Sequence, residues 1–210
     1  MSIVTPPDAA ASLARDGAQA PGPDGGPQVI LSFDVEEHHR IEAAAGLAID
    51  PALQAHCAER MDVTTRWLLD QLGERGISAT FFIVGDIALS NPDLVRAIHR
   101  AGHEVGSHGW DHRRVHRFTP ETFRDDVRRS KDALEQVTGE AVLGYRAPTF
   151  SVVRQTAWAL DVLADLGLHY DSSIYPARRS GRGAPGRSTS RRAGPGRPAC
   201  PGPRPSGGRR

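Results

Sequence analysis

Two histidines lie four residues apart in the segment Ser107-His108-Gly-Trp-Asp-His112, and this spacing lets both imidazole rings bind one cation. Borderline metals such as zinc bind readily to imidazole nitrogen. The spacing alone is weak, because surface histidines are often four residues apart. Gly106 and Gly109 free the backbone here, however, as suits a chain that leaves a strand and presents two side chains together.

A second polar cluster, Asp34-Val-Glu-Glu-His-His39, directly follows the apolar run 29–33. Carboxylates and imidazoles so close to a buried strand are costly without partners, which favours a shared site over the alternative of a solvated loop. Glu36 and Glu37 could both serve as a metal ligand. We favour Glu36, because strand alternation places it on the same side as Asp34.

Two further polar groups follow apolar runs later in the chain. Arg146 leads into the proline turn Ala147-Pro-Thr-Phe150, and a guanidinium there could hold a carboxylate through two hydrogen bonds. Taken alone, however, an ordinary ion pair is the better explanation of this arginine. The segment Asp171-Ser-Ser-Ile-Tyr-Pro176 contains common turn residues and says little by itself.

The elements that must position these groups alternate regularly between residues 29 and 176. Short apolar or β-rich runs predict strands, and amphipathic stretches with caps or terminating glycines predict helices between them. The expected strands are 29–33, 77–84, 103–107, 142–145 and 168–170, and the expected helices are 61–75, 92–101, 120–138 and 155–166. We expect the connection 40–60 to be a loop on the substrate side, because it is long.

Strands that alternate with helices form βα units and a parallel sheet, whose carboxyl ends carry the active groups. The four polar clusters would therefore meet at one edge. They supply a carboxylate base, a carboxylate ligand, two imidazoles and an orienting arginine, which together make an open metal site able to activate water and polarise a carbonyl. A closed barrel needs seven or eight strands, so five units predict an α/β fold that is an incomplete (β/α) barrel.

The motifs resemble those of the NodB-homology polysaccharide deacetylases, which remove N- or O-acetyl groups from sugar polymers. Leu31-Ser-Phe-Asp-Val-Glu36 is similar to the family's first motif, usually TFDD, in a variant associated with exopolysaccharide biosynthesis. The segment 107–112 resembles the H[ST]xxH region, and 146–150 resembles RxP[YF] with one extra residue. Tyr170-Asp-Ser-Ser-Ile174 is similar to the groove-lining segment that follows.

The resemblance implies a distorted (β/α) barrel and a role for each matching residue. Asp34 would be the general base, and Arg146 would orient it. One divalent metal, most often zinc in this family, would bind to Glu36, His108 and His112. Substrate-binding positions would be Phe150, Asp171 and Tyr175, the last through a backbone N–H that stabilises the oxyanion. The substrate would be an acetylated polysaccharide or an amino-sugar oligomer.

One departure from the family concerns its last motif, in which a late histidine protonates the leaving amine. No histidine follows His169 in this sequence. Loss of a general acid commonly lowers the rate by about 10²–10⁴-fold. An inactive remnant or a carbohydrate-binding pseudoenzyme of the same family is therefore the alternative to an active deacetylase. A metal phosphoesterase is a third hypothesis, but such an enzyme would need more carboxylate ligands, or a second metal centre, than these motifs provide.

The net charge of +1 averages two unlike parts of the 210 residues. The last 34 residues, Ala177–Arg210, contain 10 Arg, 8 Gly and 6 Pro and no acidic residue. Of the 26 Lys and Arg residues, 16 therefore remain in residues 1–176 beside 25 acidic ones, a net charge of −9. We expect a disordered leader (1–28), a partial deacetylase domain (29–176) and a disordered tail (177–210).

The tail has two interpretations. With one Lys against 25 Arg, the composition suggests a GC-rich coding sequence, and a shifted reading frame would produce such a tail. Translation of the other two frames decides this. Alternatively, the tail binds anionic polymers, but it has no Phe, Tyr or Trp for base stacking, so we expect no specific nucleic-acid partner.

Other classes are excluded by composition. No apolar run approaches the roughly 20 residues of a membrane helix, and the N-terminus does not resemble a secretory signal, so we expect a cytoplasmic protein. Cys57 and Cys200 make neither a disulfide framework nor a zinc pair. The sequence does not indicate an oligomeric state.

Overall fold

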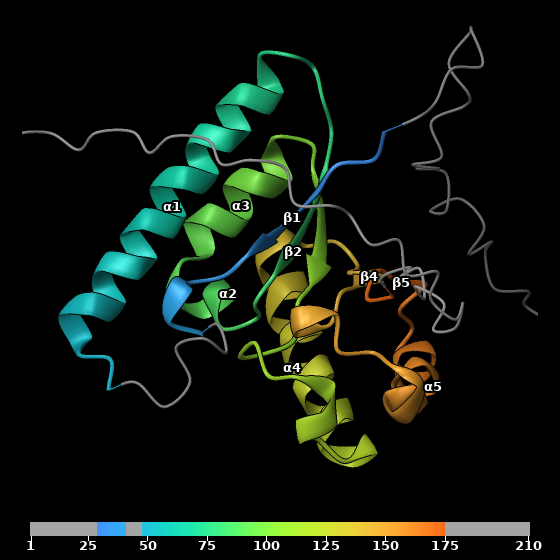
Figure 1. Cartoon of the computed structure of the whole chain (residues 1–210). Coiled ribbons are helices and arrows are strands. Elements are labelled where there is room, and N and C mark those ends of the chain that lie inside the picture. The colour runs from blue at the N-terminus through green and yellow to red at the C-terminus, as the bar shows by residue number, and fades with distance from the viewer. Residues whose placement is uncertain (1–28, 41–47, 175–210) are drawn as a thin grey trace, which may run out of the picture. The chain divides into compact units, whose positions relative to one another are not determined.

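The computed structural model describes residues 29–40 and 48–174, which fold around a five-stranded sheet (Figure 1). Its strands are β1 (Ser32–Val35), β2 (Thr80–Ile83), β3 (Glu104–Ser107), β4 (Gly144–Tyr145) and β5 (Tyr170–Asp171). The chain divides into two units, Met1–Tyr175 and Pro176–Arg210. The predicted leader 1–28, the position Tyr175 and the predicted tail 177–210 lie outside the described residues, so those expectations stay predictions.

Every pair of neighbouring strands is parallel, and the strands follow one another in the order β1-β2-β3-β4-β5. In the register of the first three strands, Asp34 lies beside Phe82 and Phe82 beside Gly106. The predicted α/β fold with a parallel sheet is confirmed. This strand order requires each crossover to pass over the same face of the sheet, because such connections are right-handed.

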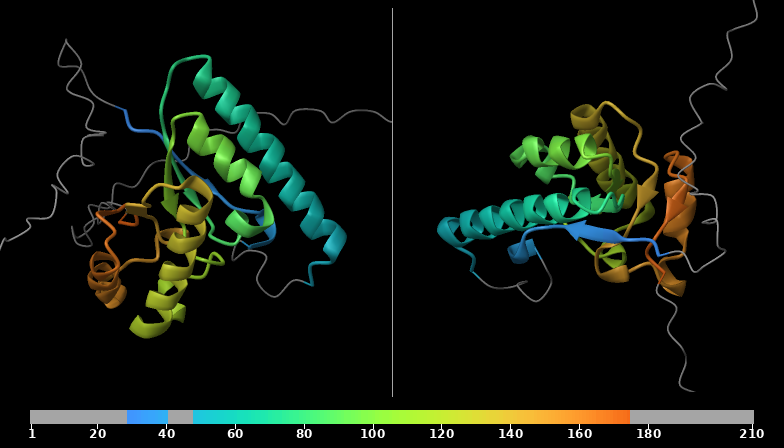
Figure 2. Two further views of the ribbon diagram at one scale, coloured as in Figure 1. Left: turned by 180° about the vertical axis from the view of Figure 1, so that it is seen from behind. Right: turned by 90° about the horizontal axis from the view of Figure 1, so that it is seen from above.

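The helices between the strands pack against one another in the order in which the strands pair. Contacts join α1 to α3, α3 to α4 and α4 to α5, so the helices form a second layer (Figure 2). The α-helices are α1 (Pro51–Gly73), α2 (Ile87–Ser90), α3 (Pro92–Arg100), α4 (Pro120–Thr138) and α5 (Trp158–Asp165). Short 3-10 turns are η2 (His38–Arg40), η4 (Val115–Arg117), η5 (Pro148–Phe150) and η6 (Arg154–Thr156).

Three of these helices start in the same way, with a capping side chain followed by proline. Asp50, Asn91 and Thr119 each accept a hydrogen bond from a backbone N–H of the first turn, and the next residue is proline in each case. The cap satisfies a donor that has no partner within the helix, and proline there lacks the N–H that would also be unpaired. The predicted starts of α3 and α4 agree with these caps.

The predicted open connection 40–60 is wrong over its second half, because α1 begins at Pro51. The buried residues of α1 start only at Met61, and residues 51–60 are largely exposed. An exposed helical segment has no apolar periodicity, so the prediction began the helix ten residues late. The four-residue helix α2 was not predicted either.

The sheet separates two sides of different character. Phe81 and Ile83 of β2 belong to the core between the sheet and the helices, and both are fully buried. Phe82 points to the other side, where the ring of Tyr170 packs edge-on at 6.4 Å between centroids. Within 29–40 and 48–174, no helix is both long and apolar enough to cross a bilayer.

Candidate metal centre

The polar clusters lie at the carboxyl ends of their strands. Glu36 follows β1, His108 follows β3, Arg146 follows β4 and Ser172 follows β5, each by one residue. Because the strands are parallel, these ends share one edge of the sheet. Asp34 differs from the prediction in lying within β1, since the strand continues to Val35 and does not end at Phe33.

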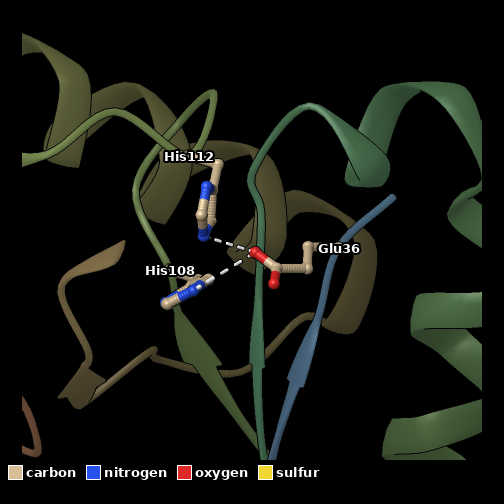
Figure 3. A group of neighbouring side chains, drawn as sticks. All are labelled: Glu36, His108 and His112. Carbon is tan, nitrogen blue, oxygen red and sulfur yellow. Dashed lines mark ion pairs between the residues drawn. The ribbon is translucent and has the colours of Figure 1, made fainter. Parts of the chain in front are cut away.

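Glu36, His108 and His112 form the centre of this edge (Figure 3). The Oε2 atom of Glu36 lies 2.5 Å from Nε2 of His112 and 3.7 Å from Nε2 of His108. One ligand atom from each residue lies within 4.8 Å of the other two. Both histidines are buried, and Glu36 is half-buried. The structure thus brings together the three predicted ligands.

Hydrogen bonds on the far side of each ring determine which nitrogen faces the centre. Nδ1 of His108 lies 2.7 Å from the carbonyl oxygen of Arg146, and Nδ1 of His112 lies 3.2 Å from that of Arg40. A carbonyl oxygen only accepts, so each Nδ1 must carry the hydrogen. In the neutral rings both Nε2 atoms then turn a lone pair toward Glu36, as metal-binding histidines do.

The group fits a divalent cation. Oε2 of Glu36 is buried and has no hydrogen-bond partner among the described residues, although two imidazole nitrogens face it. Lone pairs converging on a buried carboxylate repel one another unless a positive charge lies between them. Two imidazoles and one carboxylate are also the donor set that zinc accepts in sites with an open position.

Protonation favours the same interpretation. Burial lowers the pKa of His108 below its usual value, although the charges of Asp34 and Glu36 oppose the shift. Burial alone would raise the pKa of Glu36, but the neighbouring imidazoles of His112 and His108 hold it below its usual value. A neutral His108 and an ionised Glu36 are the forms in which these residues bind metals.

Asp34 lies next to this group and is held by Arg146. Nη1 of Arg146 donates to Oδ1 of Asp34 at 2.8 Å, while Oδ2 lies 3.9 Å from Nε2 of His108. The side chain of Asp34 is 29 % exposed, so it can meet solvent or a ligand. One oxygen is therefore fixed, and the other remains open beside the candidate metal ligands.

Arg146 makes further contacts that fix its own position. Its Nη2 donates to the hydroxyls of Ser32 and Ser172, at 2.7 and 2.8 Å, and its guanidinium stacks on the ring of Phe82 at 4.2 Å. Ser32 belongs to β1 and Ser172 follows β5, so one side chain joins the two outer strands of the sheet. The sheet must curl for both to reach it.

The three predicted substrate-binding residues differ in their surroundings. Phe150 is 43 % exposed and lies with its ring 5.6 Å from the guanidinium of Arg146. The carboxylate of Asp171 accepts hydrogen bonds from the backbone and the hydroxyl of Ser173, at 3.0 and 2.5 Å. Tyr175 lies outside the described residues. Their roles in substrate binding stay predictions.

The loop 108–112 is shaped by backbone conformation and by one acid of α4. Gly109 has φ +75°, and His112 has φ +51°, a left-handed conformation that few residues other than glycine adopt. Asp126 of α4 accepts a hydrogen bond from the backbone N–H of Trp110 at 2.9 Å. Burial raises the pKa of Asp126 to about 6, although the Trp110 N–H lowers it. Nothing in the sequence around Asp126 indicates this contact.

The prediction also missed Arg40, which lies where three loops meet. Its guanidinium pairs with Glu37 at 2.6 Å, with Asp86 at 2.5 Å, and with Asp111. Glu37 is thus engaged with Arg40, away from the group formed by Glu36. Asp86 and Asp111 come from loops far from Arg40 in the sequence, so only the strand order brings them to it.

Part of this chain is similar in sequence to proteins of one known family. The profile of the polysaccharide deacetylase family matches residues 50–170. The peptidoglycan-N-acetylglucosamine deacetylase PgdA of Listeria monocytogenes is 32 % identical over 93 residues, which is 44 % of this chain and 20 % of that protein. A chitooligosaccharide deacetylase of Bradyrhizobium is 29 % identical over 97 residues, 46 % of this chain and 42 % of the relative.

Solved structures are similar in fold. A Mycobacterium smegmatis protein assigned to the polysaccharide deacetylases superimposes with a TM-score of 0.57 and 34 % identity, over 69 % of this chain and 50 % of the other. A family 4 carbohydrate esterase of Streptomyces lividans, solved with acetate, gives 0.50 and 25 % identity, over 67 % and 59 %. The chain thus spans between a fifth and about half of the length of the curated relatives named above.

Proposed function

Because this chain belongs to the polysaccharide deacetylase family, we propose that it hydrolyses acetyl groups on an acetylated polysaccharide or amino-sugar oligomer. The observation that carries the proposal is the position of Asp34. One of its oxygens is held by Arg146 at 2.8 Å, and the other lies 3.9 Å from Nε2 of His108. A carboxylate so placed can accept a proton beside a group that fits a cation.

Glu36, His108 and His112 would hold one divalent metal, which we propose to be zinc from the donor set. When bound, zinc acts as a Lewis acid that polarises a carbonyl and lowers the pKa of water. The backbone carbonyls of Arg146 and Arg40, which accept from Nδ1 of His108 and His112, keep both rings in the tautomer that can bind zinc.

The other residues of the site orient the base and the substrate. Arg146 fixes Oδ1 of Asp34, so Oδ2 is left to accept the proton of the attacking water. The exposed ring of Phe150, beside Arg146, offers an apolar surface to a sugar ring or to the acetyl methyl group. Asp171 supports the same side indirectly, because its partner Ser173 accepts a hydrogen bond from the backbone N–H of Ala147 at 2.7 Å.

The substrate class rests on several observations. Two relatives are named for peptidoglycan N-acetylglucosamine and for chitooligosaccharides, so we propose an N-acetylated amino sugar as substrate. We also propose that the chain belongs to the branch associated with exopolysaccharide biosynthesis, because one residue separates Asp34 from Glu36. The net charge of −9 over residues 1–176 favours a neutral or amino-sugar polymer over a polyanion. We propose a cytoplasmic location, as the sequence suggests.

The test combines metal analysis with acetate release from N-acetylchitotetraose by the full 210-residue protein. We expect one equivalent of zinc, activity that is lost with a chelator and restored by zinc, and a loss of at least about 10²-fold in Asp34→Asn with the metal retained. Asp93→Asn, on the exposed surface of α3, is the matched control. Full activity in Asp34→Asn would contradict the proposal.

The second candidate is a carbohydrate-binding relative without turnover, because none of the described residues after His169 is the histidine that the resemblance assigns as general acid. The same experiment distinguishes the two. One bound zinc and measurable binding of the oligosaccharide, with no acetate released under any condition, would support the second candidate.

A further inference from the structure

Arg40 is enclosed by three carboxylates from three loops. Its side chain is only 13 % exposed. It pairs with Glu37, which follows β1 in the chain, with Asp86 at the start of α2, and with Asp111, which follows β3. Each of these loops follows a strand at the edge that carries the candidate metal centre. A guanidinium is suited to this place, because its planar fork presents five donors in fixed directions.

Arg40 also holds the segment 111–112 at two points. Its guanidinium pairs with Asp111, and its backbone carbonyl oxygen accepts the hydrogen bond from Nδ1 of His112 at 3.2 Å. His112 has φ +51°, and a left-handed non-glycine residue costs of order 1–3 kcal/mol and persists only where its surroundings hold it. The two contacts of Arg40 hold the strained residue His112 and the residue before it.

The position of the Arg40 carbonyl is itself fixed. The backbone N–H of Arg40 donates to the carbonyl of Glu37 at 2.9 Å, which closes the turn η2, and the Glu37 carboxylate pairs with the same arginine at 2.6 Å. Asp86 anchors the other side, since its backbone N–H donates to the carbonyl of Trp110 at 3.1 Å while its carboxylate holds Arg40 at 2.5 Å.

We infer that Arg40 is the positioning residue of the metal centre: it fixes the tautomer and the direction of His112 by holding the loops behind β1, β2 and β3 together. The inference rests on the proposed function, which takes His112 to be a metal ligand. Arg40 touches neither the metal nor the substrate in this role. It acts through its backbone carbonyl, which receives Nδ1–H of His112, and through its ion pair with the carboxylate of Asp111.

The charges around Arg40 support the same role. Three carboxylates around one guanidinium leave a formal net charge of −2 behind His112. Removal of the guanidinium would leave three carboxylates that repel one another and spread the loops.

The test uses Arg40→Gln and Arg40→Lys in the full chain. In metal-free protein, long-range ¹H–¹⁵N spectra report the tautomer of His112. We expect a single Nδ1–H tautomer in the wild type and a mixture in Arg40→Gln. In zinc competition titrations we expect binding about 10–100-fold weaker in Arg40→Gln, the range usual for partners behind a ligand, and a smaller loss in Arg40→Lys.

Arg124→Gln is the matched control, because its pair with Asp165 at 2.6 Å also joins separate elements but lies on α4 and α5. We expect it to lower the melting temperature without changing the His112 tautomer or zinc affinity. Unchanged tautomer and affinity in Arg40→Gln, with zinc binding to the wild type intact, would overturn the inference. Absence of zinc binding by the wild type would instead overturn the proposed function.

Discussion

The imidazoles of His108 and His112 show how a site is prepared by atoms that never touch its ligand. Each ring gives its Nδ1 hydrogen to a backbone carbonyl, of Arg146 in one case and of Arg40 in the other. Backbone carbonyls cannot be removed by substitution, so the tautomers depend on where the loops lie. Single residues therefore matter here in two ways, as the proposed ligands of the metal and as residues that hold the loops in place.

Removal of one imidazole should abolish stoichiometric metal binding. In His108→Ala the remaining donors are one imidazole and one carboxylate, too few for a tight zinc site. We expect less than a tenth of an equivalent of zinc after dialysis, measured by mass spectrometry of the metal. His116→Ala, an exposed histidine in the same segment of the chain, should retain the wild-type content. Full metal content in His108→Ala would contradict the assignment of the site.

Asp126 should make stability depend on pH. Burial raises its pKa to about 6, against an ordinary value of 3.8, despite the N–H of Trp110 and the charge of Arg113. Between these values the folded chain keeps a proton that the unfolded chain has released, so this residue lowers the free energy of unfolding as pH rises from about 4 to 6. Above about pH 6, the buried Asp126 is ionised in the folded chain, and the free energy of unfolding stays lowered by the full amount.

The substitution Asp126→Asn should remove this dependence, because the amide oxygen can still accept from Trp110 without carrying a charge. We expect the variant to be more stable than the wild type at pH 8, by about 3 kcal/mol at most, and nearly equal to it at pH 4. Urea unfolding at several pH values measures the difference. Asp125→Asn, which is exposed on α4, should follow the wild type; a parallel curve for Asp126→Asn would refute the explanation.

At the scale of elements, the sheet determines how closely its own side chains can approach. A Cβ added to Gly106 of β3 would lie 2.7 Å from the ring of Phe82 and 3.3 Å from the carbonyl oxygen of Gly144. Phe82 in turn carries the guanidinium of Arg146 at 4.2 Å. The glycine therefore allows the stack that places Arg146 beside Asp34.

Gly106→Ala should disturb both stability and activity. The methyl group must displace Phe82, and overpacking of this kind costs about 1–3 kcal/mol. We expect a lower melting temperature and a lower kcat for acetate release, with zinc content unchanged. Gly73→Ala at the end of α1, where an added Cβ meets nothing within 4 Å, should be neutral or slightly stabilising. Wild-type kcat in Gly106→Ala would show that Arg146 does not depend on this stack.

The elements also show what could be predicted from sequence. The starts of α3 and α4 were predictable, because a cap followed by proline is a local signal. The first ten residues of α1 were not, since they are exposed and carry no apolar period. The meeting of the four polar clusters followed from parallel strands. Arg40 and Asp126 could not be found in this way, because their partners lie on loops whose proximity depends on the whole strand order.

At the scale of the whole molecule, the sequence joins a part of net charge −9 to a tail of net charge +10. A tail of arginines without aromatic residues should bind polyanions through phosphate or sulfate charge alone. We expect the full chain to bind two unrelated DNA duplexes with equal affinity, which falls steeply between 50 and about 200 mM salt. Replacement of the ten tail arginines by glutamine should abolish this binding and leave zinc content unchanged. A preference for one duplex would contradict the expectation.

The contacts of Arg146 with both outer strands affect the order in which the site can form during synthesis. Arg146 holds Asp34, which precedes it by 112 residues, and also the hydroxyl of Ser172, which follows it by 26. During synthesis on the ribosome, β1 emerges first. The side chain of Asp34 lacks its hydrogen bond to Arg146 until most of the described residues have been made. Asp34 can be held only after Arg146 has been made, and the contact of Arg146 with Ser172 forms later still, after β5. If Asp34 is the base, we expect activity to appear only after β5 has been synthesised.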